Sequence, residues 1–185
     1  FMDGIDGIAG IECMSICFGV FAVLYFTDNI SIEADFALIM ALASGGFLIW
    51  NWRPAKIFLG DTGSIPLGFL LGWLLLHIII IGEWEAAIIL PMYYLGDAAI
   101  TMLKRLFSGQ RIWEAHRLHF YQRVAQNGTK HSTICFYILL LNICLTIIAI
   151  ISTKVQPFIC LSIATVFVTC FLFFLSHTSN KTIKY

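Results

Sequence analysis

Long apolar runs alternate with short polar segments along most of this 185-residue chain. Each run has about the length that a helix needs to cross a bilayer, roughly 20 residues. Because lipid cannot hydrogen-bond to backbone N–H and C=O groups, each run should be helical. The pattern predicts an all-α polytopic membrane protein with about six transmembrane helices, over residues 8–26, 36–52, 65–82, 86–103, 133–151 and 157–176.

Composition supports this interpretation and argues against a nucleic-acid-binding protein. Hydrophobic residues make up 59% of the chain, charged residues only 12%, and the mean hydropathy is +0.88. A formal net charge of zero argues against nucleic acid as a partner. We therefore expect residues 1–185 to form a single transmembrane domain.

Lys and Arg residues are distributed very unevenly between the two sides of the predicted bundle. Two follow the second run, six lie in the long segment 104–132 and two lie in the C-terminal tail, which places ten on one side against Lys154 alone on the other. The positive-inside rule makes the ten-residue side cytoplasmic. Both ends of the chain and the loop 104–132 are then predicted to be cytoplasmic.

The opening segment FMDGIDGIAG places two carboxylates at this membrane face. If the first helical turn includes them, Asp3 and Asp6 share one side of the helix, close to a helix N-terminus that favours negative charge. The interleaved glycines Gly4 and Gly7 would let a ligand approach closely. The alternative is that each Asp only caps the helix.

A second polar segment, IFLGDTGSIPLG, joins the second and third runs on the same face. Asp61 is expected in a short turn flanked by basic residues. Mg²⁺ is commonly held by one or two carboxylates together with substrate phosphates, which makes Asp61 a candidate metal ligand. A turn followed by a helix cap is the alternative.

The long loop contains IWEAHRLHFYQR, in which imidazoles and guanidinium groups are mixed. Arg117 and Arg123 suit phosphate binding, and His116 and His119 can donate hydrogen bonds or move protons. The positive-inside rule alone explains the arginines but not the histidines.

Asp97 lies about 10 Å inside the fourth run, at 1.5 Å per residue from Lys104. A carboxylate at that depth is costly and is expected to be either functional or paired with polar groups for structural reasons.

With these residues placed, the chain resembles the polyprenyl-phosphate N-acetylhexosamine-1-phosphate transferases of glycosyltransferase family 4. FMDGIDGIAG, FLGDTGS and AHRLHFYQR are similar to the successive cytoplasmic motifs of that family, most closely its O-antigen-initiating branch. The resemblance implies transfer of a sugar 1-phosphate from a UDP-N-acetylhexosamine to undecaprenyl phosphate, with Mg²⁺ as cofactor and UMP as the product released. It also implies a multi-pass protein of the bacterial inner membrane.

The resemblance assigns roles to individual residues. Asp61 matches the family's magnesium-binding aspartate, and His119 matches its histidine-containing loop. Where many members have consecutive histidines, this chain reads HFYQ, which puts the identity of the sugar in doubt. The implied catalytic residues are Asp3, Asp6, Asp61 and His119, and the implied substrate-binding residues are Gly4, Ile5, His116, Arg117 and Arg123.

The resemblance covers only the later part of such an enzyme. We therefore expect the chain to be the C-terminal part of a larger transferase that is inactive alone, and the sequence leaves open whether it forms a homodimer. Two alternatives are half of an ion-coupled transporter, with Asp97 as coupling carboxylate, and a CDP-alcohol phosphotransferase. The first would place its acids near the bilayer midplane, and the second requires a DxxxD spacing that this sequence lacks.

Overall fold

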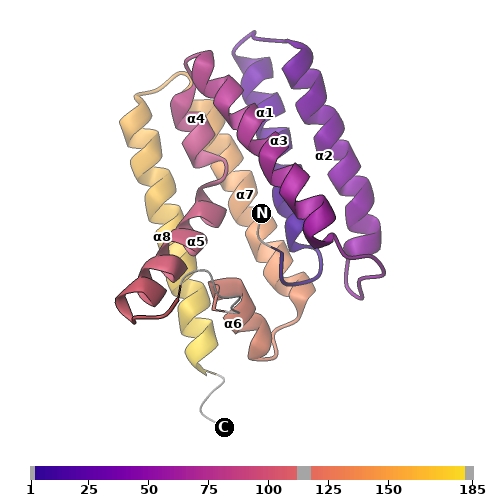
Figure 1. Ribbon diagram of the computed structural model, residues 1–185. Coiled ribbons are helices and arrows are strands. Elements are labelled where there is room, and N and C mark those ends of the chain that lie inside the picture. The colour runs from indigo at the N-terminus through magenta and orange to yellow at the C-terminus, as the bar shows by residue number, and fades with distance from the viewer. Residues whose placement is uncertain (1–2, 112–117, 182–185) are drawn as a thin grey trace.

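The computed structural model describes residues 3–111 and 118–181, and the regular secondary structure in these two ranges is entirely helical (Figure 1). The helices pack as an elongated bundle, with both short helices α4 and α6 near its ends. Their bounds are α1 Ile8–Phe26, α2 Ile32–Asn51, α3 Gly60–Ile80, α4 Trp84–Ile89, α5 Met92–Phe107, α6 Phe120–Gln126, α7 His131–Ser152 and α8 Pro157–Lys181.

Helix α1 is the centre of the bundle. In its most apolar 18-residue stretch, 72% of the residues are buried, against 22% to 39% in the same stretch of the other four described helices that are long enough to cross a membrane. Small residues allow this close packing: Gly10 lies against Leu48 of α2, and Gly19 lies against Leu90 at the end of α4. Membrane helices associate through such small residues, because lipid gives no hydrophobic drive for helix contact.

Five described helices, α1, α2, α3, α7 and α8, are long and apolar enough to span a membrane, which confirms five of the predicted spans and the all-α membrane fold. The expected fourth span was wrong as a single helix. It is divided into α4 and α5 at Pro91, which lacks the N–H needed to continue the helix. Figure 1 shows α4 at one end of the bundle and α5 nearer the other, beside α8.

The polar segments gather at one end of the bundle, where α1 and α3 begin and α6 lies (Figure 1). Two predicted boundaries differ there. Helix α1 begins only at Ile8, so Asp3 and Asp6 precede it instead of sharing its first turn. Helix α3 begins at Gly60, so Asp61 lies in its first turn and not in the preceding loop. The helix dipole favours a carboxylate in the first turn, so the helix can begin before its apolar run does.

Candidate active site

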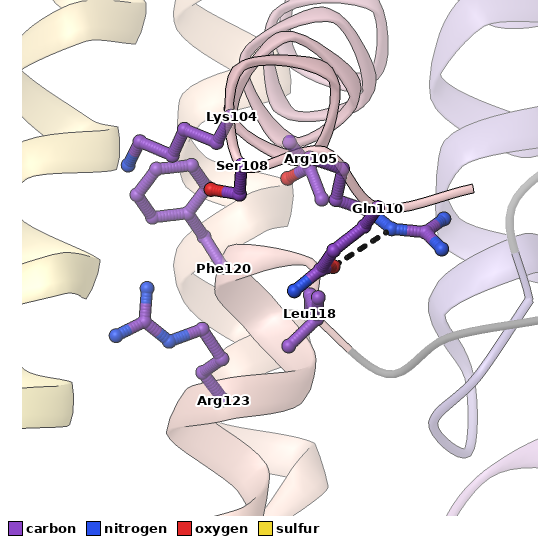
Figure 2. Close-up of a pocket in the computed structure, with 8 residues that line it drawn as sticks. Lys104, Arg105, Ser108, Gln110, Leu118, Phe120 and Arg123 are labelled. Atoms are coloured by element: carbon purple, nitrogen blue, oxygen red, sulfur yellow. Dashed lines mark hydrogen bonds between the residues drawn. The ribbon is translucent and has the colours of Figure 1, made fainter. Parts of the chain in front are cut away.

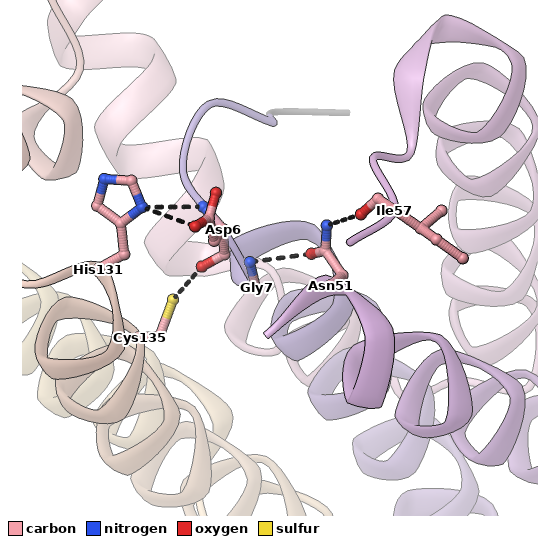
Figure 3. A network of polar contacts seen from close by, with 6 residues as sticks. All are labelled: Asp6, Gly7, Asn51, Ile57, His131 and Cys135. Carbon is pink, nitrogen blue, oxygen red and sulfur yellow. Dashed lines mark hydrogen bonds and ion pairs between the residues drawn. The ribbon is translucent and has the colours of Figure 1, made fainter. Parts of the chain in front are cut away.

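The opening segment is held against the start of α7. Asp6 contacts His131 through two groups: its carboxylate Oδ2 lies 3.4 Å from His131 Nδ1, and its backbone N–H lies 3.3 Å from the same nitrogen (Figure 3). Cys135 Sγ donates to the backbone carbonyl of Asp6 at 3.3 Å. A neutral Nδ1 accepts from the backbone N–H, whereas a protonated Nδ1 donates to the carboxylate, so protonation of His131 changes which contact holds Asp6.

Asp3 lies beside Asp6 in this segment, and the two carboxylates influence each other. Partial burial raises the pKa of the Asp3 carboxyl above its ordinary value, and the charge of Asp6 adds to this, while a hydrogen bond with the backbone of Gly4 opposes it. Repulsion between two carboxylates at one site favours a cation between or near them.

Helix α6 covers the opening segment from the other side. A methyl group at Gly4 would collide with Nε2 of Gln122 and would lie 3.1 Å from the hydroxyl of Tyr121, so a larger residue there would displace the Gln122 amide. Between the two elements is a cleft of about 530 Å³, a size that suits a small-molecule ligand. Its lining comprises Asp3, Gly4, Ile5, Gln122, Ala125, Gln126 and His131.

Asp97 joins α5 to the start of α6. Its side chain is completely buried, and Oδ1 accepts hydrogen bonds from the backbone N–H of Phe120 at 3.2 Å and from Thr101 Oγ1 at 3.1 Å. His119 Nδ1 lies 3.1 Å from the same oxygen. An ionised carboxylate only accepts, so beside an ionised Asp97 the Nδ1 nitrogen is the donor and Nε2 is the nitrogen directed elsewhere.

The histidine ring is also fixed by an aromatic neighbour. His119 and Tyr121 stack with ring centroids 5.7 Å apart and an interplanar angle of 14°. Tyr121 is fully buried, and burial together with the charge of Asp97 raises the pKa of its phenol. The phenol therefore stays protonated at neutral pH. Asp97 and Tyr121 together hold His119 in one orientation at the start of α6.

Asp61 stands apart from the other predicted site residues that the structure describes. Its side chain is exposed in the first turn of α3, and no hydrogen bond or ion pair joins it to any residue in the described part of the chain. The described residues also contain no cluster of three or more His, Cys, Asp or Glu side chains able to hold a metal ion. A hard cation that takes most of its ligands from substrate phosphates and water needs only one or two carboxylates, which Asp61 can supply.

Arg123 does not line the cleft beside Asp3. It belongs to a smaller pocket of about 140 Å³ between α5 and α6, which Figure 2 shows with Lys104, Arg105 and Phe120 around it. Lys104 Nζ lies 4.7 Å from the centre of the Phe120 ring, and Arg105 Nε donates to Gln110 Oε1 at 3.4 Å. Arg123 therefore lies apart from the cleft that contains Gly4 and Ile5, the other described residues predicted to bind substrate.

The structure thus unites some predicted residues and not others. Asp3, Gly4 and Ile5 share one cleft, and Asp6 contacts its His131 wall. His116 and Arg117 lie outside the described residues. Sequence reasoning missed His131 as the partner of Asp6, because the two are 125 positions apart in the chain and no local pattern relates them.

Comparison with known proteins supports the resemblance found in the sequence. Residues 1–79 match the model of glycosyl transferase family 4. A probable undecaprenyl-phosphate N-acetylglucosaminyl 1-phosphate transferase of Bacillus subtilis is 27% identical over 179 residues, covering 94% of this chain and 47% of the relative. The resemblance to this family that the sequence motifs indicate is therefore confirmed: the family model matches residues 1–79, and the relatives align with most of the chain.

Other relatives are named for a different activity. The phospho-N-acetylmuramoyl-pentapeptide-transferase of Streptococcus mutans is 32% identical and aligns with 70% of this chain and 41% of the relative. The enzyme of the same name from Prochlorococcus marinus is also 32% identical, with 80% of this chain and 42% of the relative covered. No solved structure matches the chain. The chain spans less than half the length of these curated relatives.

Proposed function

We propose that this chain carries part of the active site of a phospho-N-acetylhexosamine-1-phosphate transferase at the cytoplasmic face of a bacterial inner membrane. The substrates are a UDP-N-acetylhexosamine and undecaprenyl phosphate, and the products are the lipid diphosphate sugar and UMP. The observation that carries the proposal is the meeting of α6 with the opening carboxylate segment in a polar cleft at one end of an apolar bundle. A water-soluble nucleotide sugar and a lipid phosphate can meet only at such a membrane surface.

The chemistry is a phosphoryl transfer. A phosphate oxygen of the lipid attacks the β-phosphorus of the UDP-sugar, the bond from that phosphorus to the bridging oxygen breaks, and UMP leaves with the electron pair. Positioning and electrostatic stabilisation supply most of the catalysis in such reactions. In this reaction Asp3 and Asp6 line the side of the cleft where the diphosphate reacts. His119, which Asp97 holds in place, contacts a phosphate through Nε2.

Mg²⁺ is part of the proposal, with Asp61 as its protein ligand. The exposed carboxylate of Asp61 lies on the same end of the bundle as the cleft and is open to a substrate from solution. When bound, the ion neutralises charge that develops on the diphosphate.

The proposed sugar is an N-acetylhexosamine, and the proposed role is to initiate O-antigen or a related polysaccharide of the cell envelope. The Bacillus subtilis relative, which is named for N-acetylglucosaminyl 1-phosphate transfer, aligns with almost the whole chain. Tyr121 and Gln122, which stand where many family members have histidines, lie against Gly4 in this structure. Gln122 also lines the cleft, which supports a role for this position in the choice of sugar.

The proposal is tested with membranes that contain the complete gene product. UMP release from UDP-N-acetylglucosamine should depend on added undecaprenyl phosphate and should stop when Mg²⁺ is chelated. UDP-N-acetylmuramoyl-pentapeptide serves as the competing donor. Turnover of the pentapeptide donor alone would contradict the proposed sugar, and release of UMP from neither donor would contradict the proposed function.

A further inference from the structure

We propose that Asn51 is a positioning residue that joins the opening carboxylate segment to the segment leading to Asp61. This inference rests on the proposed function, because it concerns how the parts of that site are held in register. Asn51 is the last residue of α2, and only 2% of it is exposed. It lies between two segments that each carry a predicted site carboxylate.

Both ends of the Asn51 amide are used. Oδ1 accepts a hydrogen bond from the backbone N–H of Gly7 at 2.9 Å, and Nδ2 donates to the backbone carbonyl of Ile57 at 2.8 Å (Figure 3). Gly7 directly follows Asp6, and Ile57 lies four residues before Asp61. One side chain therefore connects the segment of Asp6 with the segment of Asp61.

The chemistry of this bridge requires asparagine. Asp would keep the acceptor for Gly7 but would lose the donor and face the Ile57 carbonyl with negative charge. Leu has a similar volume but can make neither bond. The position of Gly7 favours glycine, because its backbone is left-handed, with φ of 89°, and Trp52 and Cys135 lie close to where a side chain would begin. The connection must therefore come from a side chain elsewhere, which Asn51 supplies.

The loop between α2 and α3 has few other attachments. Among the described residues, two backbone hydrogen bonds hold this loop. The N–H groups of Lys56 and Ile57 donate to the carbonyl of Trp50, at 2.8 Å and 3.4 Å. These bonds close the loop on the end of its own helix α2 but give it no bond to the opening segment. Asn51 supplies that bond, so it sets where α3 and Asp61 begin relative to Asp6.

The test uses two substitutions and a control in the complete gene product. Asn51→Leu removes both bonds, whereas Asn51→Asp removes only the bond to Ile57. Asn29→Leu is the control, because Asn29 is exposed in the loop after α1, at the opposite end of the bundle. Amide hydrogen exchange of peptides covering Gly7, residues 52–60 and α7 is measured by mass spectrometry, together with kcat and KM for the UDP-sugar.

Asn51→Leu should exchange faster at both Gly7 and residues 52–60, and Asn51→Asp should do so only at residues 52–60, while α7 stays protected in both. We expect kcat to fall roughly 10- to 100-fold in Asn51→Leu, the scale of a 1 Å misplacement of reacting groups. KM should change less than about threefold, because the side-chain amide of Asn51 is already occupied by Gly7 and Ile57. Asn29→Leu should match the parent.

Parent-like exchange at both segments in Asn51→Leu would overturn the inference, as would faster exchange that includes α7 in both variants. Changed exchange with unchanged kcat would also overturn it, since the bridge would then have no effect on the site. A parent protein without transferase activity would instead contradict the proposed function. The exchange pattern would still decide whether Asn51 joins the two segments.

Discussion

Removal of the Asp97 carboxylate should disable the site by releasing His119. Asp97 is the single acceptor for three groups, because Phe120 N–H, Thr101 Oγ1 and His119 Nδ1 all lie 3.1 to 3.2 Å from its Oδ1. Two of these groups belong to the start of α6, so the carboxylate fixes both the backbone and the imidazole there. The Asp97→Ala substitution would leave all three donors without this acceptor in a buried place.

The size of the effect follows from these contacts. Hydrogen bonds to a charged group contribute about 1.5–3 kcal/mol each. The three bonds share one buried charge whose desolvation opposes them, so we expect Asp97→Ala to cost roughly 3–5 kcal/mol in total, the range for breaking one side of a buried charged contact. Asp97→Asn keeps an acceptor of the same size and should cost roughly 1–2 kcal/mol. Loss of a carboxylate that orients a histidine typically lowers activity about 10- to 100-fold.

The assay compares transfer rate and thermal stability of the detergent-solubilised gene product. Glu33→Gln is the matched control, because Glu33 Oε2 lies 3.8 Å from His77 Nε2 in a similar but partly exposed pair at the opposite end of the bundle. It should leave both stability and transfer close to those of the parent, because an ion pair that solvent reaches contributes little. The reasoning is refuted if Asp97→Asn keeps more than half of the parent rate, or if Asp97→Ala is as stable as Glu33→Gln.

Three further predictions concern the other site residues and the topology. Asp61→Asn should nearly abolish Mg²⁺-dependent transfer without affecting membrane insertion, whereas substitution of the exposed Asp28 by Asn should have no effect. The metal assignment is wrong if the Asp61→Asn enzyme still requires Mg²⁺ while the Asp3→Asn enzyme no longer does. His119→Ala should lower turnover on the order of 10²-fold or more, and a rate within about twofold of the parent would contradict its role at phosphate. Cysteines introduced near Asn29 should react with an impermeant reagent only from outside and those near Gln110 only from inside; labelling of both from one side would contradict the topology.

Much of the fold could be predicted because membrane helices have a strong local signal. The five unbroken spans follow from runs of apolar residues, and their observed ends differ from the predicted ones mainly where polar residues continue a helix. The division at Pro91 could also have been predicted, since proline is unfavourable inside a helix. Asp61 was misplaced in a loop, because hydropathy does not detect the polar first turn of α3.

The site could be predicted only as a set of motifs. The carboxylates and histidines are recognisable in short segments, but which of them meet depends on helix packing. Asp97 with His119 and Asp6 with His131 join residues 22 and 125 positions apart. Arg123 was predicted to bind substrate together with Gly4 and Ile5, but it lines the smaller pocket between α5 and α6 and not their cleft.

The central claim is that this site transfers a sugar together with its phosphate to a lipid. It is tested most directly with UDP-N-acetylglucosamine that carries ³²P in the β-phosphate, added to membranes containing the complete gene product and undecaprenyl phosphate. Because the bond broken lies between the two phosphates, the account predicts that the β-label enters the lipid fraction and that unlabelled UMP is released in equal amount. Recovery of the β-label in released UDP would show transfer of the sugar alone and would contradict the account.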